Sequence, residues 1–353
     1  MRPAETTREL LLPLSSDAEL RRRFLVLREH IPGNLRFGVL LEELDRLAAR
    51  TAIEYVQLAH PDGTVVTAAV DEILVRGLAD ASRDLACKAR INRVGRRSME
   101  VGIRVGPVDG PSPPYATCYF TMVARRGAGA EARSVEVEPL QLADGLARRR
   151  EAEALARQQA WRERQAAADQ PPTDEERRAL EALHAARSAA GFEGPLAGGL
   201  AVESWERTYP VQENPSHLIF GGYIMRRAYE LASIAAELVA PNRPVVAAVN
   251  RVNFLQPVQI GDKLRFTSAV VLTEGPAICV QTSIERRSRD RTVSALSNSC
   301  LFTFVNVDRE LRLRPVPQVH PVTPAEDFRW LDARRQLRAL QARLEEPWLG
   351  LGG

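Results

Sequence analysis

The chain repeats one pattern of elements after about 180 residues. Each copy has an apolar helix opened by a phenylalanine–glycine pair, then a valine-rich strand and, further on, a second apolar strand. The matched positions lie 183, 180 and 182 residues apart and are, in that order, Phe37 and Phe220, Val65 and Val245, and Phe120 and Phe302. A duplicated unit buries its apolar face against its twin, so we expect a site that lies between the two copies and is shared by them.

Each copy is predicted to form one long helix followed by antiparallel strands. The first helix starts at Phe37, after which apolar residues recur at helical spacing as far as Ala48. Segments with β-branched or alternating residues predict the strands of the first copy at 53–58, 64–70, 84–94, 98–105 and 116–125. A sheet wrapped around a central helix satisfies this pattern, so the predicted fold class is α+β.

A charged, alanine-rich segment separates the copies. It is predicted to form two polar helices interrupted at Gln170-Pro171-Pro172-Thr173-Asp174, and a further helix is predicted near the C-terminus. The expected domains are an N-terminal arm with the first unit over 1–139, a linker over 140–198, the second unit over 199–320 and a helical tail over 321–353.

Composition excludes several classes of protein. No apolar run approaches the roughly 20 residues that a membrane span requires, and the first residues, MRPAETTREL, lack the apolar core of a secretory signal. The net charge is +3 and no basic block is interleaved with aromatic residues, so no nucleic-acid partner is expected. The four cysteines lie in apolar stretches, as buried reduced thiols do. We therefore expect a cytoplasmic protein.

Several segments resemble the hotdog-fold acyl-CoA thioesterases, in particular the tandem double-hotdog group whose animal members are mitochondrial. The resemblance covers roughly residues 10 to 335, and the segments that carry it are IFGGYIMRRAYELA (219–232), VNFLQPVQIGD (252–262), RFGVLLEELD (36–45), VGRRSMEV (94–101) and PLSSDAELRRRF (13–24). It implies two hotdog domains packed as a pseudo-dimer, each an antiparallel sheet around a long helix, and further assembly, often as a trimer. The implied reaction, which belongs to lipid metabolism, is hydrolysis of an acyl-CoA thioester to CoA and a carboxylic acid without a separate cofactor.

Thioester hydrolysis needs a donor for the developing oxyanion and a base for the attacking water. Gly221 and Gly222 open the second helix, so their N–H groups and the positive end of the helix dipole suit the carbonyl oxygen. Asp45 falls at the border of the first helix's buried stripe and matches the family's carboxylate-bearing segment. Glu42 is expected to point further outward. A solvated Asp45, or glycines that only permit close packing, is the structural alternative.

Comparison of the copies predicts one competent site per chain. His217 precedes Phe220 by three positions, where relatives tend to carry asparagine, and it could hold the carbonyl, orient water or make only a structural hydrogen bond. We expect His217, Gly221 and Gly222 to face Asp45. The reciprocal site would combine Asn34 and Gly38 with Glu230, but Ala228 replaces the aspartate there, so that site is predicted to be degenerate.

CoA carries phosphates, which arginine binds through two parallel hydrogen bonds. The candidate phosphate ligands are Arg96, Arg97, Arg286 and Arg287. Asn253 and Phe254 match the family segment that lines the acyl tunnel, although core packing also accounts for Phe254.

Other reaction classes find less support in the sequence. The five histidines show no metal-ligand spacing and no Gly-x-Ser-x-Gly motif occurs, so no metal site and no serine nucleophile are expected. A catalytically weak acyl-CoA-binding or regulatory protein remains an alternative because of His217 and the single intact site. A hydratase would need an Asp-x-x-x-x-His pair, which the segment before His217 lacks.

Overall fold

The computed structural model describes residues 1–28, 35–77, 79–108, 114–127, 131–168 and 170–345. The first copy and its N-terminal arm comprise η1 (Pro3–Thr6), β1 (Arg8–Leu12), α1 (Ala18–Phe24), α2 (Phe37–Val56), β2 (Thr64–Val75), β3 (Leu85–Val94), β4 (Ser98–Pro107), β5 (Ala116–Arg126) and β6 (Arg133–Ser134). The linker holds α3 (Gly145–Ala168) and α4 (Asp174–Arg187). The second copy and tail comprise η3 (Ala197–Gly199), β7 (Ala201–Arg207), η4 (Pro210–Gln212), α5 (Gly221–Glu237), β8 (Arg243–Phe254), β9 (Lys263–Glu274), β10 (Ala277–Arg287), β11 (Ser294–Val307) and α6 (Pro324–Glu345).

The two copies form one continuous antiparallel sheet. Its strand order is β1-β3-β4-β5-β2-β8-β11-β10-β9-β7, with β6 paired to β5. Each half has the same strand order when it is read from its edge to the middle of the sheet: β1, β3, β4, β5 and β2 in the first half, and β7, β9, β10, β11 and β8 in the second. The duplication seen in the sequence is therefore a duplication of topology as well.

The central strands β2 and β8 join the halves. They pair antiparallel, with Val70 opposite Val252 and Ile73 opposite Val249, and all four side chains are buried. Burial of apolar area at this depth is the main stabilising term in a protein core. The halves consequently share one core.

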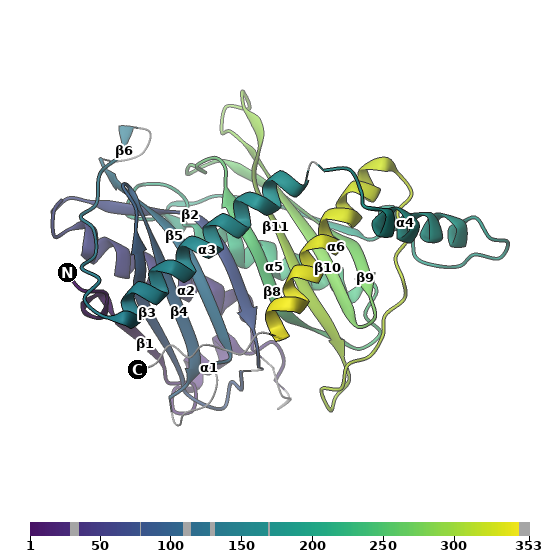
Figure 1. Ribbon diagram of the computed structural model, residues 1–353, viewed down its shortest axis with the longest axis horizontal. Coiled ribbons are helices and arrows are strands. Elements are labelled where there is room, and N and C mark those ends of the chain that lie inside the picture. The colour runs from purple at the N-terminus through teal and green to yellow at the C-terminus, as the bar shows by residue number, and fades with distance from the viewer. Residues whose placement is uncertain (29–34, 78, 109–113, 128–130, 169, 346–353) are drawn as a thin grey trace.

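The helices lie on both faces of the sheet (Figure 1). Helices α2 and α5 lie side by side on one face, and α3 and α6 cross the opposite face. The main core fills the space between the sheet and the α2–α5 pair, whereas Trp330, Leu337 and Leu340 of α6 pack on a second apolar cluster on the outer face. The expected α+β architecture, one long helix against an antiparallel sheet in each half, is confirmed.

Helix α2 is longer than the sequence pattern indicates. The strand predicted at 53–58 is wrong, because α2 continues to Val56. The β-branched Ile53 and Val56 and the aromatic Tyr55 favour a strand locally, but tertiary packing overrides that weak preference. Tyr55 is 5% exposed, and its hydroxyl donates a 2.7 Å hydrogen bond to the Glu138 carbonyl.

The linker and the tail cover the outer face of the sheet. Helix α4 begins at a capping box in which the Glu176 N–H donates to Thr173 Oγ1 at 3.2 Å. Arg343, near the end of α6, forms a 2.5 Å ion pair with Glu72 of β2, so the tail of the second half reaches the first. The domain boundaries expected at 139, 198 and 320 fall outside the α-helices and strands and stay a prediction. Among the described residues, no helix is long and apolar enough to cross a membrane.

Candidate active site

The N-terminus of α5 meets the middle of α2 through a hydrogen bond. The Gly222 N–H donates to Asp45 Oδ2 at 2.7 Å, although the two residues are 177 positions apart in the sequence. The first N–H groups of a helix have no partner within the helix and carry its positive dipole end, so a carboxylate is favoured there. The structure thus brings together the glycine pair of one copy and the aspartate of the other.

Asp45 is fully enclosed. Its exposed fraction is 0%, and the Thr67 hydroxyl of β2 donates a 2.7 Å hydrogen bond to Oδ1. Burial raises the pKa of Asp45 to about 6, while the hydrogen bonds from Thr67 and Gly222 favour the charged form and oppose part of that rise. A carboxylate with such a pKa can both take up and release a proton near neutral pH.

The two glycines leave room for the carboxylate. A Cβ atom on Gly222 would lie 3.0 Å from Asp45 Cβ and 3.1 Å from Oδ2, and one on Gly221 would lie 3.0 Å from the Phe254 ring. All three distances are shorter than ordinary van der Waals contacts. Glycine at these positions therefore permits the close approach of α5 to α2 that forms the site.

A cavity of about 460 Å³ lies beside this contact. The start of β2, the loop before α5 and the end of β8 form its wall, and its lining includes Thr67, Asn214, Leu218, Gly221, Phe254 and Pro257. Gly221 faces the cavity, whereas Gly222 and Asp45 do not line it. Thr67 and Gly221 thus connect the cavity to the carboxylate behind them.

Asn214 enters the cavity wall, and His217 does not. Asn214 Oδ1 accepts hydrogen bonds from the backbone N–H groups of Ser216, at 2.8 Å, and Leu218, at 3.2 Å. This turn contributes Asn214 to the cavity lining. His217 adopts a left-handed backbone with φ 59°, its side chain is 65% exposed, and Nδ1 lies 2.6 Å from Glu213 Oε1. The structure therefore does not bring His217 to the Asp45 site.

The arginine candidates differ in their surroundings. Arg96 is exposed and pairs with Glu136 at 2.7 Å, and Arg97 is exposed with a 3.5 Å hydrogen bond to Ser134. Arg286 is only 12% exposed and pairs with Asp262. Arg287 stacks 4.9 Å from the Trp205 ring centroid. The cavity lining includes none of these four arginines.

One unpredicted arginine does reach the cavity. Arg125 of β5 lines it, together with Ser134, the partner of Arg97. Phe254 lies on the wall as expected, whereas Asn253 does not, although its carbonyl accepts a 3.2 Å hydrogen bond from Asn298.

The reciprocal position carries different chemistry. Ala228 is fully buried at the place that corresponds to Asp45, and Glu230 forms 2.6 Å ion pairs with Arg36 and Arg227. A Cβ on Gly38 would lie 3.1 Å from Arg226 Cγ, so that side chain occupies the space beside it. Asn34 lies outside the described residues.

Glu42 departs from the orientation expected for it. It is 5% exposed instead of pointing outward, and it pairs with Arg46 and, at 2.8 Å, with Arg226 of α5. The neighbouring helix covers the face of α2 that the pattern assigned to solvent.

Thr67, Asn214 and Arg125 are among the residues of the cavity wall that sequence reasoning missed. The Asn-Pro-Ser segment at 214–216 is typical of a turn in which the asparagine side chain accepts backbone hydrogen bonds, and this signal could have indicated Asn214. Thr67 has no such signal. The register of β2 against β5 shifts beside it, between Thr67 and Ala69, and such bulges redirect side chains next to active sites.

Known proteins resemble this chain over most of its length. Residues 217–292 match the model of the Thioesterase superfamily. The chain is 28% identical over 365 residues to human acyl-coenzyme A thioesterase 9, mitochondrial, covering 97% of this chain and 79% of that one. It is also 28% identical over 374 residues to acyl-coenzyme A thioesterase 4, mitochondrial, of Humulus lupulus, covering 98% and 67%.

A solved structure supports the fold over both halves. The acyl-ACP thioesterase of Bacteroides thetaiotaomicron superposes with a TM-score of 0.50 over 86% of this chain and 100% of its own, at 10% sequence identity. At that identity the likeness concerns the fold alone. The two-copy sheet with its central helices, the glycine–aspartate contact and the sequence comparisons agree: the chain is similar over nearly its whole length to acyl-coenzyme A thioesterases, and residues 217–292 match the Thioesterase superfamily.

Proposed function

We propose that this chain hydrolyses acyl-CoA thioesters to a free carboxylic acid and CoA. The observation that carries the proposal is Asp45, a buried carboxylate whose pKa is raised to about 6 and which contacts the N-terminus of α5 beside a cavity of about 460 Å³. The names of the relatives point to the same reaction class.

Asp45 acts in this proposal as the general base. It accepts a proton from a water molecule as the water oxygen bonds to the thioester carbon, and the carbonyl π electrons move to the oxygen. When the carbonyl re-forms, the C–S bond breaks and the CoA sulfur leaves with its electron pair. The proton held by Asp45 then passes to that sulfur, which restores the carboxylate. Water and the CoA of the substrate supply every atom, so the reaction requires no cofactor.

The two glycines have separate roles. Gly222 donates to Asp45 and positions the carboxylate. Gly221, which lines the cavity, is the proposed N–H donor for the oxyanion, assisted by the positive end of the α5 dipole. Asn214 is a second proposed donor, because it lines the cavity and both of its side-chain hydrogen bonds within the described residues are accepted by Oδ1.

Substrate binding is assigned to two groups of residues on the cavity wall. Phe254, Leu218 and Pro257 supply apolar wall for the acyl chain. Arg125, with Arg97 near Ser134, is the proposed ligand for a CoA phosphate, since a guanidinium binds phosphate through parallel hydrogen bonds. His217, Asn253, Arg286 and Arg287 are given no direct contact with substrate.

Assembly and compartment are further parts of the proposal. Apolar side chains remain exposed on and after edge strand β7, namely Trp205, Tyr209 and Val211, which supports assembly of several chains, as a trimer. Four buried thiols suit a reducing compartment such as the cytoplasm, although several relatives are named as mitochondrial. Light scattering of the purified protein tests the trimer.

The test of hydrolysis is release of free CoA thiol from acyl-CoA esters of different chain lengths. Wild type is compared with Asp45→Asn, which keeps the side-chain volume, and with Asp62→Asn, an exposed aspartate paired with Arg126, as the control. We expect turnover by wild type and the control and its loss in Asp45→Asn. Binding of acyl-CoA without any thiol release by wild type would instead identify a binding protein.

A further inference from the structure

A second cavity occupies the repeat-equivalent position. It measures about 390 Å³ and is bounded by the segment before α2, the start of β8 and the end of β2. The first cavity is bounded by the segment before α5, the start of β2 and the end of β8. Leu35 and Val75 of the second cavity correspond to Leu218 and Phe254 of the first, since each pair occupies the same place in its copy.

This second cavity lacks the groups that hydrolyse a thioester. Ala228 stands where the first site has Asp45, and the start of β8 contributes Pro244, Val245 and Val246 where β2 contributes Thr67. The space beside Gly38 is taken by Arg226 and Tyr229. The duplication has therefore kept a cavity here without a counterpart of Asp45.

The wall of the cavity is suited to a hydrocarbon chain. Most of the lining side chains are apolar, among them Phe37, Leu40, Val75, Val105 and Val246. Pockets of this volume with an apolar lining and few polar groups bind small molecules. At one side Arg36 and Glu230 satisfy each other through a 2.6 Å ion pair, and the Ser233 hydroxyl donates to the Glu230 carbonyl at 2.8 Å.

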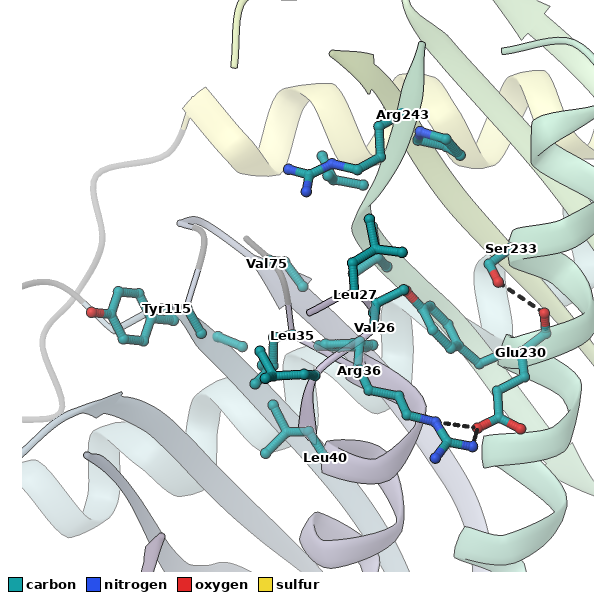
Figure 2. Close-up of a pocket in the computed structure, with 18 of the residues that line it drawn as sticks. Val26, Leu27, Leu35, Arg36, Leu40, Val75, Tyr115, Glu230, Ser233 and Arg243 are labelled. Atoms are coloured by element: carbon teal, nitrogen blue, oxygen red, sulfur yellow. Dashed lines mark hydrogen bonds and ion pairs between the residues drawn. The ribbon is translucent and has the colours of Figure 1, made fainter. Parts of the chain in front are cut away.

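A cation lies at the other side. In Figure 2, the Arg243 guanidinium and the Arg36–Glu230 pair lie on opposite sides of the apolar side chains Leu27 and Val75. Burial lowers the pKa of Arg243, which shows that its charge is partly removed from water. An anionic group placed against a partly desolvated guanidinium gains a strong, charge-assisted hydrogen bond.

We propose that this second cavity binds an aliphatic carboxylic acid, with its hydrocarbon chain among Leu40, Val75 and Val246 and its carboxylate at Arg243. The ligand is bound and not converted, because Ala228 takes the place of Asp45 and the Glu230 carboxylate is paired with Arg36 and Arg227. One chain would then hold two ligands of related chemistry, one at the Asp45 site and one at this cavity.

The binding test uses decanoate as the probe and requires no turnover. Calorimetry on wild type is expected to resolve binding that Arg243→Gln weakens about tenfold, the loss of one charge-assisted hydrogen bond. Ser233→Phe, which fills the cavity from its half-exposed rim on α5, should abolish the same component. Arg309→Gln, an exposed arginine after β11, is the matched control and should bind as wild type does. Circular dichroism melting confirms that each variant is folded.

Photolabelling with a diazirine analogue of decanoate locates the ligand. Label in the peptides that carry Leu40, Val75 or Val246, lost in Ser233→Phe, supports the proposal. Label confined to the peptides around Asn214 and Phe254, or binding unchanged in both cavity variants, overturns it. Neither outcome depends on thioester hydrolysis, so the proposal and the proposed activity can fail separately.

Discussion

Gly222 and Asp45 form a hydrogen bond of 2.7 Å that joins the two copies of the repeat at the site of chemistry. The donor is the N-terminus of α5 in the second copy, and the acceptor lies within α2 of the first. Burial of a charged carboxylate costs free energy unless hydrogen bonds offset it, and this contact supplies one of them to the fully buried Asp45. Neither copy can form the site alone.

The rate of hydrolysis should depend on the charge of Asp45. Because a general base must be unprotonated, kcat/KM is expected to fall about tenfold per pH unit below the Asp45 pKa of about 6. Thr67→Val removes a hydrogen bond that stabilises the carboxylate, so the acid limb should move to higher pH. Thr121→Val, which removes the same kind of bond from Asp71, is the control and should leave the limb in place.

Stability should also report the titration of Asp45. Its pKa is raised on folding, so the stabilisation is complete below the ordinary aspartate pKa and is lost as pH rises through about 6. Asp45→Asn carries no charge, so its free energy of unfolding relative to wild type should increase by about 2–3 kcal/mol between pH 4 and pH 7.5. Urea unfolding at the two pH values measures this change. A constant difference would show that the folded protein does not raise the pKa.

Gly222→Ala should damage the site. The added Cβ would lie 3.0 Å from Asp45 Cβ and 2.7 Å from the Phe220 ring, so the carboxylate or α5 must shift. We expect at least a tenfold loss of kcat and a destabilisation of about 1–3 kcal/mol. Gly145→Ala has open space around its Cβ and should leave kcat unchanged. Equal kcat values for the two variants would contradict the close-contact argument.

Mutation of Asn214 and mutation of His217 should have different effects on kcat. His217→Ala is expected to change kcat less than twofold because the side chain is exposed and pairs only with Glu213 among the described residues. Asn214→Ala should lower kcat by about 100-fold through loss of an oxyanion donor. Asn214→Asp keeps the acceptor for Ser216 and Leu218, removes the donor and adds a negative charge, so it should show at least the same loss of kcat with an unchanged melting temperature. A large loss of kcat in His217→Ala would show that the histidine does take part in the reaction.

Mutation of Arg125 should affect substrate binding, whereas mutation of Arg286 should affect stability. Arg125→Gln is expected to raise KM for acyl-CoA about tenfold with little change in kcat, if the guanidinium binds a phosphate. Arg286→Gln leaves Asp262, which is 1% exposed, without its buried cation and should cost about 3–5 kcal/mol of stability instead. Initial rates together with thermal melts distinguish the two effects.

Much of the fold could be predicted from the sequence because its signals are local. The 3.6-residue period of α2, the alternation in β4 and β5, and the capping box at Thr173 each lie within a few positions. Residues 53–58 show the limit of such signals, since β-branching predicts a strand there and packing extends α2 to Val56. Thr67 and Arg125 could not be assigned to the site, because no local pattern says which face of a bulged strand meets the other copy.

By itself, the sequence determined that the protein consists of two copies of a helix-and-strands unit, with glycines opening the helix of one copy and an aspartate within that of the other. Only the tertiary structure decided how these groups are used: Gly222 holds Asp45, Gly221 faces the cavity, Asn214 lines it and His217 turns out. The physical reason is distance along the chain. A helix period reveals a buried face, but the partner of that face lies 177 residues away, and only packing of the two copies brings it into contact.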